Sequence, residues 1–217
     1  MKPIKTNRIF QIIYPIVVYF FVYQVGVSLL IQIIGEKYGT VLCLLIAGII
    51  CLIPIYTIYK RIPKLIPDDT VDSSVVVRYV LWILGVVALG IILNIILTHT
   101  PLVESSEGFK RASNTLTDGN LALMLLCNGI VIPVLEELLI RGIVVGQIYM
   151  WRGGLVAILA SSICFGILHN NIVQFIYAVI VGIGLGLMYI KNKRLLLCII
   201  AHGLINSIVI IYGYLGG

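Results

Sequence analysis

The chain has 217 residues, of which 60% are hydrophobic and only 11% are charged, and its mean hydropathy is +1.12. A soluble domain carries roughly a quarter of charged residues. The composition therefore excludes a water-soluble protein and predicts a multi-pass membrane protein. The formal net charge is +6, but the Lys and Arg residues separate apolar runs and do not gather on one solvated face, which argues against a nucleic-acid partner.

Seven apolar runs follow one another along the chain. Lipid admits only helices or closed barrels as spanning structures, and a spanning helix needs about 20 apolar residues. The runs are too long for barrel strands, so we predict an all-α, polytopic fold with about seven transmembrane helices. They cover residues 9–34, 41–59, 79–98, 121–150, 155–168, 172–190 and 195–214.

The fourth run would measure about 46 Å as one helix, longer than the roughly 30 Å hydrocarbon core. We therefore expect an oblique or broken helix around residues 138–152. The first run is too long for the core of a signal peptide, so it is expected to be a retained helix.

Basic residues are concentrated in every second connection between these runs. The N-terminus, the connection 60–78, Arg152 and the turn 191–194 together hold eleven of the fifteen Lys and Arg residues. The positive-inside rule then predicts a cell-membrane protein with a cytoplasmic N-terminus and an external C-terminus.

Two connections are long. Residues 60–78 are expected to form a cytoplasmic loop, and the polar residues 99–120 are expected to form an external, turn-rich loop. The second loop predicts a boundary between an N-terminal three-helix part, residues 1–118, and a C-terminal helical core, residues 119–217.

Five ionisable residues lie within or at the end of apolar runs, where they are costly unless they are paired or face a cavity. They are Glu136, Glu137, Arg141, His169 and His202. Glu137 and Arg141 are four residues apart and are expected to form an ion pair. Glu136 lies about 140° away from Arg141 around the helix. That position leaves Glu136 available as a general base.

Two further pairs have the same four-residue spacing. His202 and Asn206 project together, and Phe165 places a ring beside His169. A Glu with a His can take a proton from water, and His and Asn N–H groups can stabilise the oxyanion formed when water attacks a carbonyl. The spans contain no H-E-x-x-H motif and no Asp, which argues against a helical zinc protease and an aspartyl dyad.

Three motifs stand in order on successive apolar segments. Glu136-Glu137-x-x-x-Arg141 is E-E-x-x-x-R, Phe165-x-x-x-His169 is F-x-x-x-H, and His202-x-x-x-Asn206 is H-x-x-x-N. In this order they resemble the CPBP family of intramembrane proteases, also called the Abi or CAAX protease and bacteriocin-processing family, which includes the type II CAAX prenyl endopeptidase. The resemblance covers roughly residues 120–210.

The resemblance implies an intramembrane endopeptidase that needs no cofactor and hydrolyses a peptide bond of a membrane-associated peptide or protein. It implies that Glu136 and His169 activate water, that Arg141 holds Glu137, and that His202 and Asn206 stabilise the oxyanion. Bacteriocin, pheromone and CAAX-type substrates are all compatible with it.

Other functions fit the same residues. Glu136, His169 and His202 could instead supply the ligands of a catalytic zinc ion. Buried Glu, His and Arg residues also mark ion or proton pathways, as in a coupled transporter. A non-catalytic immunity membrane protein that keeps the fold is a third alternative.

Overall fold

The computed structural model describes residues 7–63 and 75–215, and its elements in these ranges are helices. Six helical stretches are long and apolar enough to cross a membrane, and a seventh apolar helix is shorter. The prediction of an all-α fold with about seven membrane helices is confirmed. The long stretches are Arg8–Tyr38, Thr40–Arg61, Val76–Thr98, Leu121–Arg152, Ile172–Asn192 and Leu195–Tyr214, and the short one is Gly154–Ile167.

Most of these stretches are single α-helices. They are α4 (Thr40–Arg61), α5 (Val76–Thr98), α11 (Gly154–Ile167), α12 (Ile172–Asn192) and α13 (Leu195–Tyr214). The stretch 8–38 alternates α-helical and π-helical turns. Its parts are α1 (Arg8–Tyr19), η1 (Phe20–Val25), α2 (Gly26–Leu30), η2 (Ile31–Gly35) and α3 (Glu36–Tyr38).

The stretch 121–152 is also one helical rod with π-helical parts. Its parts are α8 (Leu121–Met124), η4 (Leu125–Val131), α9 (Ile132–Glu137), η5 (Leu138–Val145) and α10 (Gly146–Arg152). The chain therefore stays helical through residues 138–152, where a break was one expectation, and it widens to a π-helix at 138–145. Such π-helical turns are frequent at functional sites.

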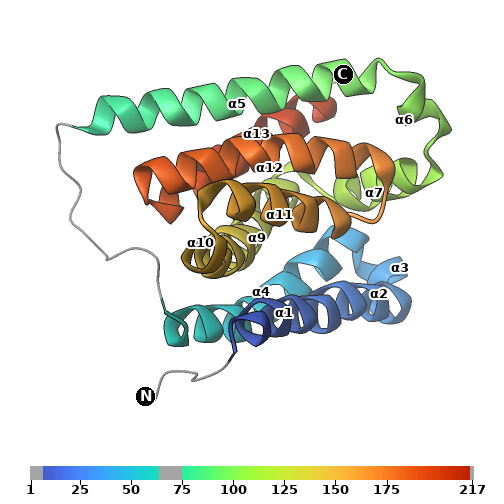
Figure 1. The fold of residues 1–217 in the computed structure, drawn as a ribbon. Helices are drawn as coiled ribbons and strands as arrows, with labels where there is room; N and C mark the ends of the chain where they lie inside the picture. Colours follow the sequence, from blue (N-terminus) through green and yellow to red (C-terminus); the bar gives the residue numbers. More distant parts are fainter. Residues whose placement is uncertain (1–6, 64–74, 216–217) are drawn as a thin grey trace.

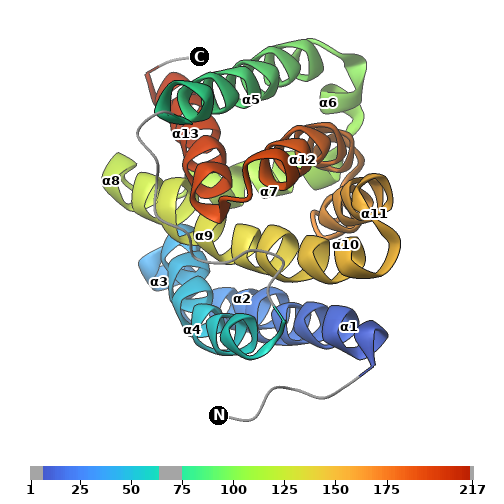
Figure 2. The same cartoon turned by 60° about the vertical axis from the view of Figure 1, so that its left-hand side comes forward.

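This rod is the centre of the fold. Figures 1 and 2 place α1 and α4 on one side of it and α11, α12 and α13 on the other, while α5 lies outermost against α12 and α13. Burial follows this order. In the most apolar 18-residue segment of each stretch, 67% of the rod is buried, compared with only 17% of α5. Three charged residues of the rod, Glu136, Glu137 and Arg141, are consequently buried.

The outer surface suits a bilayer. Large apolar side chains such as Ile33, Ile53, Val77, Leu155 and Leu196 are 62–75% exposed. The basic helix ends lie on one side: α4 ends, α5 begins and α12 ends at the left of Figure 1, whereas α3, α6 (Pro101–Ser105) and α7 (Glu107–Thr117) lie at the right.

The expected turn-rich loop at 99–120 is instead two short helices, α6 and α7. Pro101 occupies the first turn of α6, and the Ser106 side chain accepts a hydrogen bond from the Phe109 N–H at the start of α7. Both are features that begin helices. The loop expected at 60–78 lies largely outside the described residues, and the division into parts 1–118 and 119–217 stays a prediction.

The end of α7 is tied to the start of α4. The Asp118 carboxylate accepts from the Thr40 N–H at 2.8 Å, and the Thr40 hydroxyl donates to the Thr115 carbonyl at 2.8 Å. In addition, the Asn128 side-chain amide donates to the Leu116 carbonyl at 3.2 Å. Three hydrogen bonds therefore hold α7 across the end of the bundle.

Helix α13 crosses the central rod at two glycines. A Cβ atom at Gly203 would collide with the backbone carbonyl oxygen of Gly129, and one at Gly129 would lie 2.5 Å from the Ser207 hydroxyl. The absence of side chains there lets the two backbones approach closely, which brings His202 and Asn206 next to the carboxylates of α9.

We predict that Gly203→Ala destabilises the protein by about 3 kcal/mol, because the added methyl group must push two backbones apart. The measurement is thermal unfolding of the purified protein in detergent. Gly213→Ala is the matched control on the same helix, since a Cβ there meets no atom within 4 Å. Equal unfolding temperatures for the two variants would show that the crossing is not tight.

Candidate active site

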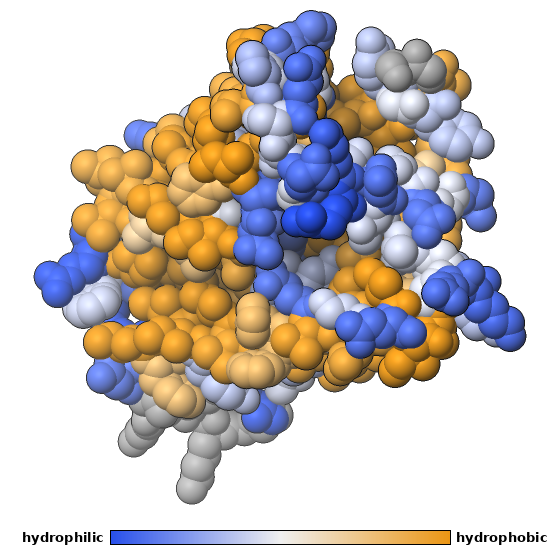
Figure 3. Space-filling model, turned by 90° about the vertical axis from the view of Figure 1, so that its right-hand side faces the viewer, coloured by the Kyte–Doolittle hydropathy of each residue, from blue (hydrophilic) through white to orange (hydrophobic). Residues whose placement is uncertain are grey.

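One cavity of about 850 Å³ opens between the central rod, α12, α13 and α7. Figure 3 shows a hollow surrounded by hydrophilic residues on the face that carries α6 and α7, with apolar surface around it. The four predicted catalytic residues, Glu136, His169, His202 and Asn206, all line this cavity, whereas Glu137 and Arg141 do not. Residues from three separate parts of the sequence are thus brought together.

The Glu137 carboxylate is buried and binds two other side chains of the site. Its Oε1 atom accepts from Arg141 Nη1 and from His202 Nδ1, both at 2.9 Å, and both Glu137 and Arg141 are 0% exposed. Arg141 Nη2 also donates to the Gly182 carbonyl of α12 at 3.2 Å. The predicted ion pair is present, and it joins the central rod to α12 and α13.

Glu136 has looser contacts on the cavity wall. The Tyr19 hydroxyl donates to its Oε1 at 3.4 Å, and His202 Nε2 lies 3.8 Å from its Oε2. Because Arg141 pairs with Glu137 and not with Glu136, Glu136 keeps an oxygen surface toward the cavity. The neighbouring carboxylates therefore differ as the helical spacing predicted: one is paired with the arginine and the other is not.

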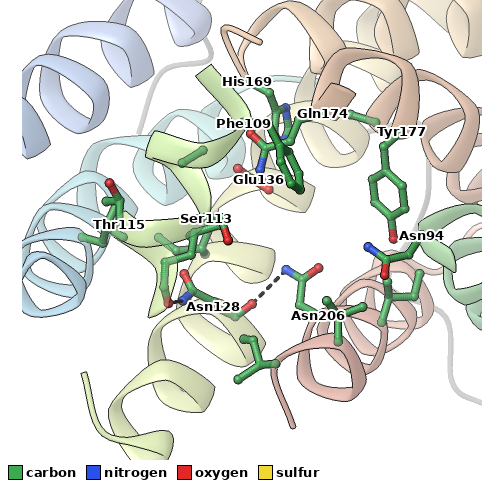
Figure 4. A pocket seen from close by; sticks show the side chains of 18 of the residues that line it. Asn94, Phe109, Ser113, Thr115, Asn128, Glu136, His169, Gln174, Tyr177 and Asn206 are labelled. Carbon is green, nitrogen blue, oxygen red and sulfur yellow. Dashed lines mark hydrogen bonds between the residues drawn. The ribbon is translucent and has the colours of Figure 1, made fainter. Parts of the chain in front are cut away.

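His169 lies in the turn between α11 and α12 and points into the cavity (Figure 4). Its Nδ1 atom is 2.9 Å from the Phe165 carbonyl oxygen. A carbonyl can only accept, so Nδ1 carries the proton and Nε2 of the neutral ring has a free lone pair. This tautomer suits a proton acceptor.

Phe165 fills the space behind the polar side chains. Its ring centroid lies 4.9 Å from that of His169 and 5.8 Å from that of His202, both edge to face, and the Arg141 guanidinium lies 4.9 Å from it. The ring is 3% exposed. It fixes both imidazoles and gives the arginine a cation–π contact.

Asn206 is oriented by the central rod. Its Nδ2 atom donates to the Asn128 carbonyl at 2.9 Å (Figure 4), which leaves its second N–H for the cavity. In a π-helical turn, the Asn128 carbonyl would accept a hydrogen bond from the N–H of the residue five positions later. That residue is Pro133, which has no N–H. The proline and the π-helix together make the acceptor available.

Sequence reasoning missed two polar residues of the first helix. Tyr19 contacts Glu136, and Gln24 Nε2 donates to the Leu168 carbonyl at 2.6 Å, next to His169. Both line the cavity. Gln24 could have been noticed as an amide in an apolar run, whereas Tyr19 gave no signal of its own.

The alternative zinc ligands do not form a compact group. Within residues 7–63 and 75–215, no cluster of three His, Cys, Asp or Glu side chains is arranged to hold a metal ion. Glu136, His169 and His202 all line the cavity but do not make up such a cluster.

The fold and the site define a polytopic membrane protein with a buried Glu/His/Asn centre. Residues 118–208 match the family model described as "Type II CAAX prenyl endopeptidase Rce1-like". The match covers less than half of the chain, agrees with the resemblance to the CPBP family of membrane proteases drawn from the three motifs, and supports the assignment of the site to an intramembrane protease.

A curated relative supports this assignment. The chain is 26% identical over 170 residues to "Putative membrane peptidase YdiL" of Bacillus subtilis (strain 168), an alignment that covers 76% of this chain and 69% of that protein. No solved structure matches the chain significantly.

We predict that Arg141→Leu destabilises the protein by about 3–5 kcal/mol, because it leaves the Glu137 carboxylate buried without its cation. The double variant Glu137→Leu/Arg141→Leu should recover part of this loss. Thermal unfolding in detergent measures both. Lys110→Leu, which breaks the exposed Lys110–Glu107 pair at 3.0 Å, is the control and should change stability by less than about 1 kcal/mol.

Proposed function

We propose that the protein is an intramembrane endopeptidase in which Glu136 and His169 activate a water molecule. The observation that carries the proposal is the cavity itself, which is lined by Glu136, His169, His202 and Asn206 while the Glu137–Arg141 pair stays behind the wall. Substrates are peptides or membrane-anchored proteins that reach this cavity from the bilayer or its surface.

In the proposed reaction, water loses a proton to Glu136 or to the free Nε2 of His169 as its oxygen bonds to the scissile carbonyl carbon. General base catalysis of this kind contributes about 10²–10⁴-fold to the rate. The same proton then passes to the leaving amine as the C–N bond breaks. The contacts of Tyr19 and His202 with Glu136 keep its carboxylate in place.

The oxyanion of the intermediate is held by N–H groups of Asn206 and His202. Asn206 has one side-chain N–H left after its bond to Asn128. His202 already donates from Nδ1 to Glu137, so it donates to the oxyanion from Nε2 when the ring carries both protons. Arg141 and such a cationic His202 would balance the charges of Glu136 and Glu137.

The orientation follows from the basic residues. With the basic helix ends at the cytoplasmic face of the cell membrane, α6, α7 and the hollow of Figure 3 face the outside. The N-terminus is then cytoplasmic and the C-terminus external, as the sequence predicts.

We expect Glu136→Gln to lower kcat for peptide cleavage by at least about 100-fold without loss of folding, because the amide cannot accept a proton. The measurement is cleavage of internally quenched peptides by purified protein in detergent. Glu36→Gln makes the same change at an exposed position of α3 and should retain full activity. Equal activity of the two variants would contradict the role of Glu136.

His169→Ala should lower kcat to a similar extent, since the lone pair of Nε2 is lost. The control is His99→Ala, which removes an exposed imidazole that bonds to the Ile95 carbonyl and does not line the cavity. If no candidate peptide is cleaved and proteoliposomes show a Glu136-dependent ion flux, the protein is a transporter and the protease proposal fails.

We propose further that the reaction needs no metal ion. Protein shown by elemental analysis to be free of zinc should then keep its full cleavage rate in the presence of a chelator. Loss of activity that added Zn²⁺ restores would instead establish the zinc mechanism with Glu136, His169 and His202 as ligands.

A further inference from the structure

We infer that Gln24, in the first helical stretch, is a positioning residue of the proposed reaction and holds the turn that carries His169. The inference rests on the proposed endopeptidase function and adds to it a residue outside positions 118–208, which match the family model. Three observations carry it: the hydrogen bond that Gln24 makes, the shape of the turn that receives this bond, and the π-helical turn that directs Gln24 to the site.

The hydrogen bond of Gln24 joins two helices at the residue before His169. Its Nε2 atom donates to the Leu168 carbonyl at 2.6 Å. Leu168 is the C-cap of α11, and the last carbonyls of a helix have no N–H partner within that helix. Gln24 therefore supplies a donor from a helix 144 positions away in the sequence, and this bond fixes the end of α11.

The turn after α11 depends on contacts that hold it. Asn170 lies in the left-handed region with a φ of +53°, a conformation that persists only where the surrounding structure maintains it. Two further bonds are local: His169 Nδ1 to the Phe165 carbonyl at 2.9 Å, and Asn171 Nδ2 to the His169 carbonyl at 3.1 Å. These bonds set the shape of the turn, whereas the bond from Gln24 sets its place relative to the first helical stretch.

The first stretch also contacts the second group that is proposed to take a proton from water. The Tyr19 hydroxyl donates to Glu136 Oε1 at 3.4 Å. Positions five apart in a regular α-helix face directions about 140° apart. The π-helical turn η1 lies between Tyr19 and Gln24, and its wider i→i+5 hydrogen bonding rotates Gln24 toward the side of Tyr19. Both side chains consequently line the cavity.

One helical stretch thus sets the spacing of the two proton acceptors. Glu136 belongs to the central rod and His169 to the turn between α11 and α12, and both point into the same cavity (Figure 4). A general base has to lie within hydrogen-bond reach of the proton that it takes. Because a displacement of about 1 Å can cost on the order of 100-fold in rate, loss of the Gln24 bond should slow the chemical step.

The test compares Gln24→Met, which keeps the side-chain length but removes the donor, with Gln32→Met as the matched control. Gln32 is an exposed residue of the same stretch and does not line the cavity. The substrate is the peptide that the purified wild-type protein in detergent cuts fastest from a pool of internally quenched dodecapeptides. We expect Gln24→Met to lower kcat at least about tenfold and to change KM less than about twofold. Gln32→Met should change neither.

Thermal unfolding in detergent shows whether each variant is folded. If Gln24→Met does not fold, Gln24→Asn takes its place with the same expected result, because its amide is one methylene group too short to reach the Leu168 carbonyl.

Nuclear magnetic resonance of protein labelled with ¹⁵N-histidine gives a readout that does not depend on cleavage. The chain has three histidines, and single alanine variants assign their ring signals. We expect Gln24→Met to shift or broaden the ring signals of His169 and to leave those of His99 unchanged. A merely structural role of Gln24 would lower the unfolding temperature without singling out His169.

A wild-type kcat in Gln24→Met, or unchanged His169 signals, would overturn the inference and leave the endopeptidase function intact. A raised KM with an unchanged kcat would also overturn it, since Gln24 would then bind substrate and not position His169. If the wild-type protein cuts no peptide of the pool faster than the Glu136→Gln variant does, the proposed function fails and the inference with it.

Discussion

The site depends on one buried carboxylate that is shared by two cations or cation-forming groups. Glu137 Oε1 accepts from Arg141 and from His202, and Arg141 extends the contact to the Gly182 carbonyl of α12. The central rod, α12 and α13 are thereby joined at a buried point. A buried charge without a partner is costly, so these helices must keep their relative positions for the fold to persist.

The sharing of Glu137 also explains why two consecutive glutamates differ. Arg141 pairs with the buried carboxylate of Glu137, while the Glu136 carboxylate faces the cavity and contacts the Tyr19 hydroxyl and the His202 imidazole. Phe165 contacts Arg141, His169 and His202 at once. One aromatic ring therefore links the structural ion pair to the two histidines that line the cavity.

Contacts within one helix could be predicted from the sequence, whereas contacts between distant segments could not. The spacing of Glu137 and Arg141 predicted their ion pair, and apolar run lengths predicted the helices. Tyr19 meets Glu136 across 117 positions, and no periodicity carries that information. Residues 99–120 were predicted as a loop because many of them are polar. The prediction gave no weight to the apolar residues among them, Phe109, Ala112 and Leu116, which line the cavity from α7. The π-helical turns that free the Asn128 carbonyl have no sequence signature beyond Pro133.

The short helix α11 sets the depth at which the proposed reaction would take place. Its 14 residues measure about 21 Å, and it begins beside Arg152 at the basic face, so in a core of roughly 30 Å it ends about 9 Å below the opposite boundary when it runs along the bilayer normal. The turn that follows it carries His169. In the proposed orientation, the scissile bond of a substrate therefore has to enter only the outer third of the hydrocarbon layer. A substrate segment that dips below the headgroups can reach that depth without being unwound from the middle of a transmembrane helix.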